Sequence, residues 1–309
     1  MLRLRLHGSA RPSQVAAHAS RVLLRGLSNV VDRDSSSLTS LPHFADRGEE
    51  NGKTRGESVW ENPMPHPVYD MQIIRDVPQV HHDPDGLADR IALGAVRVLR
   101  RGFDVVSRYR GPGGGMTEQA WLNRCLFLET IAGVPGMVGG MTRHMRSLRL
   151  MRRDYGWIHT LLEEAENERM HLLIFMALKQ PGTLMRLMVL GAQGVFFNLF
   201  FVSYLISPRT CHRFVGYLEE EAVKTYTGLL HDIHQNAALH QWQRRAAPVI
   251  AQKYYKLPDK ATLEEMILCI RADEANHRDV NHTFAQLNQI DDVNPFIRRN
   301  KAREHQTSE

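Results

Sequence analysis

The chain has 309 residues, of which 43% are hydrophobic and 24% charged, so it can form one large globular domain and is neither a disordered nor a fibrous chain. Its net charge of +5 arises from five arginines within residues 1–27, a stretch without lysine or acidic residues, and the remainder is neutral. This distribution excludes a broad basic surface for nucleic acid, and the dispersed cysteines Cys125, Cys211 and Cys269 exclude a disulfide framework.

Residues 1–27 have the composition of a mitochondrial transit peptide. They are rich in arginine and in small residues, and the first acidic residue of the chain is Asp32. A disordered basic tail is the plainer alternative. We expect residues 28–82 to form an N-terminal arm that is partly disordered, because its first half is polar.

From Asp83 onward the hydrophobic pattern is helical, with little strand-like alternation. We predict one domain at 83–300 and a C-terminal tail at 301–309. Within that domain the helices are expected at about 84–109, 117–149, 155–179, 183–206, 209–239 and 260–289. Pro135 should kink or break the second helix. Thr262 and Glu265 form a capping box at the start of the last.

Two of these helices have the character of membrane-binding segments. The stretch 184–206 carries a single charged residue, Arg186, and is about long enough to span a bilayer. The stretch 86–109 is apolar on one face with arginines opposite, as in a helix that lies in the membrane interface. A single span at 184–206 would separate the acidic residues that flank it, so we expect a monotopic protein held in one leaflet.

A carboxylate and an imidazole lie three residues apart in two of the predicted helices. Glu168 and His171 form one such pair, and Glu274 and His277 form the other. Residues at this spacing share a helix face. One pair alone is commonly a surface ion pair, but two pairs in apolar helices, with a glutamate on each of two further helices, match the ligand set of ferritin-like di-metal bundles.

The first additional glutamate is Glu129, in the run CLFLETIAGVPG. The second lies within Glu219-Glu220-Glu221. We choose Glu219 because it lies seven residues before Tyr226, on the same face of the predicted helix. Glu221 is then a candidate either for the substrate site or for a hydrogen-bond partner of the metal ligands. Tyr226 is either a core tyrosine or a redox-active group. The pattern as a whole predicts an all-α fold, a ferritin-like four-helix bundle that holds two iron or manganese ions, with two additional membrane-binding helices.

Four longer sequence blocks contain these residues: RCLFLETIAGVPGMVGGM, EAENERMHL, FVGYLEEEAVKTYTG and RADEANHRDVNH. They resemble the motif blocks of the alternative oxidase family, the cyanide-insensitive mitochondrial ubiquinol oxidases, and the protist and fungal branch is more similar than the plant one. The resemblance covers roughly 83–300. It implies oxidation of two ubiquinols and reduction of O₂ to two waters, without proton pumping. It also implies a homodimer on the matrix side of the inner mitochondrial membrane, with two iron ions per chain.

The resemblance assigns roles to individual residues. The positions that match its iron site are Glu129, Glu168, His171, Glu219, Glu274 and His277, and Tyr226 matches its redox-active tyrosine. The positions that match its quinol pocket are Arg100, Arg124, Cys125, Leu128, Leu218, Glu221, Ala222 and Thr225. The positions that match its surrounding hydrogen-bond network are Asn167, Asp273, His212, Asp104 and Arg271. Whether the histidines bind iron directly or hydrogen-bond a ligand carboxylate stays open at this stage.

Other readings of the same pattern are weaker. A quinone hydroxylase shares the order of the ligands but lacks the LET and LEEEAV blocks. A plastid-type terminal oxidase is a nearer relative, but its targeting segment should be rich in serine and threonine. An iron-storage protein needs a soluble surface, against which the apolar 184–206 argues. A membrane-anchored interaction protein leaves six converging ligands unexplained.

Overall fold

The structure is a computed structural model that describes residues 66–297, and within this range the regular elements are helices. The all-α prediction is therefore confirmed. The transit peptide predicted at 1–27, the arm up to residue 65 and the tail at 301–309 lie outside the described residues. The elements in chain order are α2 (Met71–Ile74), α3 (Gly86–Val106), α4 (Glu118–Leu150), α5 (Trp157–Leu178), α6 (Thr183–Ile206), α7 (Pro208–Gln235), η3 (His240–Gln243), α8 (Val249–Tyr255) and α9 (Leu263–Phe284).

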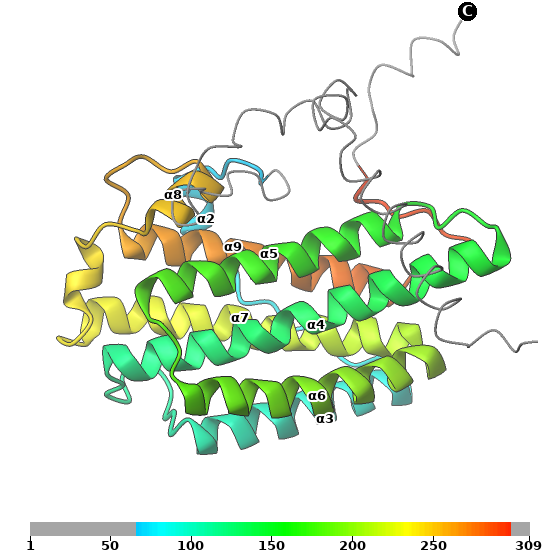
Figure 1. Cartoon of the computed structure of the whole chain (residues 1–309), viewed down its shortest axis with the longest axis horizontal. Helices are drawn as coiled ribbons and strands as arrows, with labels where there is room; N and C mark the ends of the chain where they lie inside the picture. The colour runs from blue at the N-terminus through cyan, green and yellow to red at the C-terminus, as the bar shows by residue number, and fades with distance from the viewer. Residues whose placement is uncertain (1–65, 298–309) are drawn as a thin grey trace, which may run out of the picture. The chain divides into compact units, whose positions relative to one another are not determined.

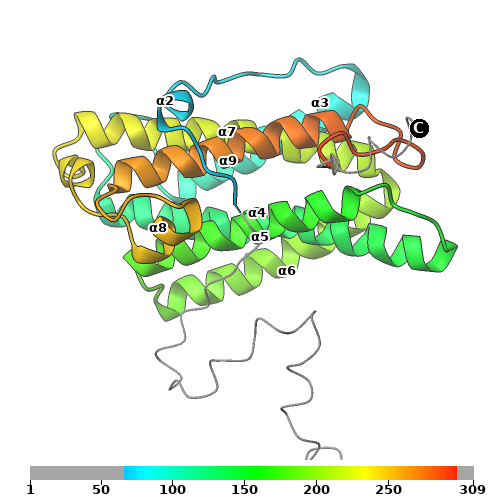
Figure 2. The ribbon, with the colours of Figure 1, turned by 90° about the horizontal axis from the view of Figure 1, so that it is seen from above.

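Four long helices form the bundle. α4 pairs with α5 and α7 pairs with α9, and Figure 2 shows the two pairs next to each other. Thr117, Ser207 and Thr262 each accept a backbone N–H at the start of α4, α7 and α9. The capping box predicted for Thr262 and Glu265 is confirmed.

The helix that contains Pro135 does not end there, so of the two predicted outcomes, a kink or a break, the break does not occur. α4 runs through this residue as one helix of 33 residues. The reason is its packing against α5: a Cβ on Gly136 would lie 2.6 Å from the Leu161 carbonyl oxygen, and one on Gly140 would lie 3.0 Å from the Leu162 side chain. The two backbones approach closely over this whole stretch, and the contact holds α4 helical despite the hydrogen bond that proline cannot make.

Gly136→Ala is expected to lower the free energy of unfolding by about 1–3 kcal/mol, because the new methyl group must push α4 and α5 apart. The matched control is Gly94→Ala in α3, where a Cβ meets nothing within 4 Å and alanine should stabilise the helix by up to about 1 kcal/mol. Thermal unfolding followed by circular dichroism measures both changes. Equal stability of the two variants would contradict the close approach.

α3 and α6 lie along one side of the bundle, the lower side in Figure 1. α6 is apolar and long enough to cross a bilayer, yet only 11% of its most hydrophobic window is buried. α4 is also long and apolar enough to cross a bilayer, but it is a core helix of the bundle, and 44% of its most apolar stretch is buried. On α3, Leu87, Ile91 and Val98 are exposed, while Leu93 and Val96 pack on α7. The bundle therefore presents an exposed apolar surface on the side of α3 and α6.

The segment between residue 66 and α3 packs along α9. Arg271 donates to the carbonyl oxygens of Ile74 and Arg75 at 2.9 Å each, and Arg278 donates to that of Pro78 at 3.0 Å. The predicted helix at 209–239 ends earlier, and the η3 turn and α8 follow it, neither of which the sequence pattern indicated. α8 is short, but its Tyr254 and Tyr255 are buried, and the Tyr255 hydroxyl donates to Asp273 at 2.8 Å.

Candidate metal centre

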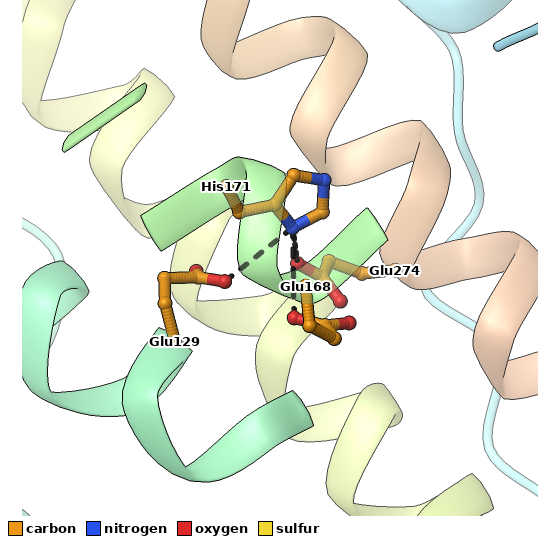
Figure 3. A group of neighbouring side chains, drawn as sticks. All are labelled: Glu129, Glu168, His171 and Glu274. Atoms are coloured by element: carbon orange, nitrogen blue, oxygen red, sulfur yellow. Dashed lines mark ion pairs between the residues drawn. The ribbon is translucent and has the colours of Figure 1, made fainter. Parts of the chain in front are cut away.

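The six predicted metal ligands come together between the four long helices. Glu129 lies on α4, Glu168 and His171 on α5, Glu219 on α7, and Glu274 and His277 on α9; Figure 3 shows four of them pointing toward one another. They form two overlapping groups, in each of which the candidate ligand atoms lie within 4.8 Å of one another. Glu168 and Glu274 belong to both groups. Glu168 and Glu274 would therefore be available to a cation held by either group.

The side chains of the six are buried, with exposed fractions from 0% for His171 to 8% for His277. Nδ1 of His171 lies 3.4 Å from a Glu129 oxygen and 3.3 Å from a Glu274 oxygen. Nδ1 of His277 lies 2.7 Å from a Glu168 oxygen. None of these contacts has hydrogen-bond geometry: both Nδ1 atoms, both Glu168 oxygens and one oxygen of Glu129 and of Glu274 lack a hydrogen-bond partner.

Buried polar atoms without partners are costly unless something satisfies them. Here the atoms are carboxylate oxygens and imidazole nitrogens that face one another, the donor set that a transition-metal cation accepts. Burial raises the pKa of Glu129 to about 8, against the lowering influence of His171. Burial and the charges of Glu274 and Glu168 raise the pKa of Glu219 well above its usual range. A bound cation would offset this repulsion, so the residues fit a metal site.

The three consecutive glutamates of α7 take three different places. Glu219 joins the metal cluster. Glu220 is buried and accepts from the rings of His81 and His282, at 2.6 and 3.0 Å. Glu221 lies beside α3, and one of its carboxylate oxygens is 3.3 Å from Nη1 of Arg100. The structure thus places Glu219, the glutamate chosen from the sequence, in the candidate cluster.

Tyr226 borders the cluster from α7. Its hydroxyl donates a hydrogen bond to Glu129, and its ring is 3% exposed and stacks on Phe175 with centroids 6.3 Å apart. Burial and the charge of Glu129 raise the pKa of Tyr226 well above its usual range, so the group is a neutral phenol. A tyrosine in this place is both a core residue and a hydrogen-bond partner of a candidate ligand.

The predicted quinol-pocket residues gather where α3, α4 and α7 meet. Arg124 is fully buried, donates to Asp104 at 2.5 Å and to Ser107 at 2.7 Å, and stacks over Tyr109 at 4.2 Å. Arg100 donates to the other oxygen of Asp104 and to Thr225, at 2.8 Å each. Asp104 thus bridges the two arginines. The remaining members, Cys125, Leu128, Leu218 and Ala222, are buried or half-buried on α4 and α7.

Not every predicted network residue touches the cluster. Asn167 and Asp273 lie beside it, and Asp273 accepts a 2.9 Å hydrogen bond from Nε2 of His171. His212 connects indirectly, through its 3.1 Å contact with Asn281. Arg271 instead ties the N-terminal segment to α9 and does not reach the metal ligands.

The structure adds residues that the sequence pattern did not single out. Glu164 lies one turn before Glu168 and accepts from the Asn281 amide at 2.9 and 3.1 Å. His66 and Tyr69 reach Asp273 from the N-terminal segment. Glu164 is detectable as a further acid on the inward face of its helix. His66 and Tyr69 give no such signal, because they do not belong to a predicted helix and lie about 200 residues before Asp273 in the sequence.

Comparison with known proteins identifies the family of this fold and site. The sequence model of the alternative oxidase family matches residues 69–286. Mitochondrial alternative oxidase of Emericella nidulans is 58% identical over 240 residues, which are 75% of this chain and 68% of the relative. That of Aspergillus niger is 56% identical over 254 residues, 79% of this chain and 71% of the relative. Both relatives are fungal and mitochondrial, in agreement with the predicted branch and organelle. The chain belongs to the alternative oxidase family, and its activity is that of a ubiquinol oxidase.

Proposed function

We propose that the metal centre holds two iron ions and that the protein uses them to couple the oxidation of two ubiquinols to the reduction of O₂ to two waters. The observation that carries this proposal is the convergence of six carboxylate and imidazole ligands whose facing atoms have no hydrogen-bond partner. Four carboxylates and two imidazoles suit iron or manganese better than zinc or copper. Iron bound there would supply the redox chemistry that reduces O₂.

The proposed role of the histidines follows from the contacts of their other ring nitrogen. Nε2 of His171 faces the Asp273 carboxylate at 2.9 Å, so the proton resides on Nε2 and the Nδ1 lone pair faces Glu129 and Glu274. A carboxylate behind a histidine is the usual support of a metal ligand. We therefore assign His171 to direct ligation, and His277, whose Nδ1 faces Glu168, to the same role.

Tyr226 is proposed as the residue that moves a proton and an electron. Its Oη donates to a Glu129 oxygen, so the proton has an acceptor in place when the phenol is oxidised. Because the phenol is neutral, loss of an electron and loss of this proton occur together. The quinol supplies the hydrogen that restores it.

The quinol is proposed to bind at the junction of α3, α4 and α7. Arg100 and Arg124 are fixed by Asp104, and Nε of Arg124 has no hydrogen-bond partner among the described residues, so it can donate to a quinol oxygen. The half-buried Leu128, Leu218 and Ala222 would line the route of the apolar ring toward the metal ligands.

We further propose that α3 and α6 hold the protein in one leaflet of the inner mitochondrial membrane, on its matrix side. Glu168 precedes α6 and Glu219 follows it, yet both belong to one cluster, which a single crossing by α6 does not allow. A quinol dissolved in the same leaflet then reaches the pocket laterally.

This topology predicts that the protein stays in the pellet when membranes are washed with 1 M salt. Alkaline carbonate should also leave it bound, because the protein is held by two apolar helix faces and not by electrostatic attraction to the membrane surface. Protease added to sealed inner-membrane vesicles whose matrix face is inside should cleave no part of residues 66–297. A protected fragment that ends within α6 would instead indicate a span.

A homodimer is proposed through α4 and α5. Met137, Met141, Met145 and Leu148 form an exposed stripe on α4, at the spacing of one helix face. Such a stripe on the side of a folded bundle fits a second copy of the chain. Light scattering of the detergent-solubilised protein tests this.

The function is tested by assaying purified protein for ubiquinol-dependent O₂ uptake in the presence of cyanide, with iron and manganese counted per chain. We expect cyanide-insensitive uptake, about two irons per chain, and loss of uptake when a chelator removes them. Uptake by metal-free protein, or manganese at full occupancy, would contradict the proposal.

A further inference from the structure

The carboxylate of Asp273 collects hydrogen bonds from three separate parts of the chain. It is 3% exposed and lies on α9. Its donors are Nε2 of His66 at 2.8 Å, the hydroxyl of Tyr69, Nδ2 of Asn167 at 3.1 Å, Nε2 of His171 at 2.9 Å and the hydroxyl of Tyr255 at 2.8 Å. His66 and Tyr69 bond to Oδ1, and the other three bond to Oδ2.

The two oxygens of the Asp273 carboxylate therefore bind different parts of the chain. Oδ2 faces the bundle and the His171 ring, whereas Oδ1 faces the N-terminal segment. His66 is itself held at both ends, because Nδ1 lies 2.6 Å from the Pro67 carbonyl oxygen and the ring is 9% exposed. A carboxylate fixed at Oδ1 cannot rotate about its own axis, and so presents Oδ2 to His171 in one orientation only.

We propose that His66 and Tyr69 are positioning residues of the metal centre, which act through Asp273 to fix the orientation of the His171 ring. This inference rests on the proposed function, because it assumes that the cluster beside the His171 ring holds iron. It gives the N-terminal arm a role in the reaction, although none of its described residues, 66–82, makes a hydrogen bond or ion pair with the six candidate ligands.

The arm has other attachments that do not involve Asp273. Arg271 and Arg278 hold its backbone carbonyls, and His81 contacts Glu220 at 2.6 Å. Loss of the His66 hydrogen bond should therefore leave the arm in place. The His66 ring also packs against Tyr254 and Tyr255, with centroids 4.8 Å apart in each case, so a variant that keeps the size of the side chain separates the hydrogen bond from this packing.

The experiment compares His66→Ala with His66→Gln, whose amide nitrogen can replace Nε2, and with Tyr69→Phe, which removes one hydroxyl. Asp70→Ala is the matched control, because it removes the cap of α2 in the same segment but makes no contact with Asp273. Each purified protein is measured for the rate at which a chelator extracts iron, for the electron paramagnetic resonance spectrum of the half-reduced centre, and for kcat and KM with ubiquinol.

We expect iron to leave the His66→Ala protein about 10–100 times faster than wild type, with a changed spectrum, a lowered kcat and an unchanged KM. Glutamine should restore most of the wild-type iron retention, spectrum and kcat, and Tyr69→Phe should change these three properties in the same direction but less. Asp70→Ala should resemble wild type. If His66→Ala does not fold, Tyr69→Phe carries the test alone.

Two results would overturn the inference. One is wild-type iron release, spectrum and kcat in both His66→Ala and Tyr69→Phe. The other is an equal loss in Asp70→Ala, which would mean that the arm acts only by general stability. Neither result touches the proposed function, which fails instead if wild-type protein holds no iron or does not oxidise ubiquinol.

Discussion

Replacing Glu168 with alanine is expected to abolish ubiquinol-dependent O₂ uptake and to lower the iron content of the purified protein. Glu168 is one of two carboxylates that belong to both ligand groups, so its loss removes an oxygen from each candidate metal position at once. It also removes the group that faces Nδ1 of His277 at 2.7 Å. The affinity for iron should fall by more than the 10–100-fold that follows loss of a supporting residue.

The matched control for this variant is Glu166→Ala, two residues earlier on the same helix. Glu166 points away from the cluster and pairs with Arg169 at 2.6 Å on the surface. Such a pair contributes at most about 1 kcal/mol, so iron content and turnover should stay at the wild-type level. Elemental analysis and oxygen-electrode rates measure both proteins. Retained turnover in Glu168→Ala would reject the assignment of this cluster as the reaction site.

The sequence predicts the bundle well because its signals are local. Helix periodicity, the capping box at Thr262 and the i, i+3 pairs on α5 and α9 each depend on residues within a turn or two of one another. The two pairs, together with Glu129 and Glu219, then specify one common centre, because four amphipathic helices can bury these acids only by turning them inward. The surroundings of that centre follow much less directly from the sequence.

The features that the sequence did not predict depend on tertiary contacts. Pro135 should disrupt a helix by its own chemistry, but the close packing of Gly136 on α5 holds α4 continuous. Asp273 could be named as a network residue, but not its partners His66 and Tyr69, because nothing local marks an arm residue that bonds about 200 positions away. α8 is too short to show a helical period, although it carries Tyr255 to Asp273.

Tyr226→Phe is expected to retain iron and lose turnover, which separates the chemistry of the hydroxyl from the assembly of the site. The phenyl ring keeps its place against Phe175, so the core around it should not change. Glu129 loses one hydrogen bond from the hydroxyl but keeps its oxygens for the metal. If the hydroxyl gives up a proton and an electron during the reaction, kcat should fall by about a hundred-fold or more.

The matched control is Tyr217→Phe, nine residues earlier on the same helix. Tyr217 is equally buried, but its hydroxyl has no hydrogen-bond partner among the described residues, so its removal should leave kcat unchanged. Rapid freezing during turnover should also yield a tyrosyl radical signal in wild type and in Tyr217→Phe that is absent from Tyr226→Phe. Normal turnover of Tyr226→Phe would make Tyr226 a packing residue. A joint loss of iron and turnover would instead mean that its hydroxyl serves to hold Glu129, because a hydrogen bond to a buried carboxylate is worth about 1.5–3 kcal/mol to the orientation of that ligand.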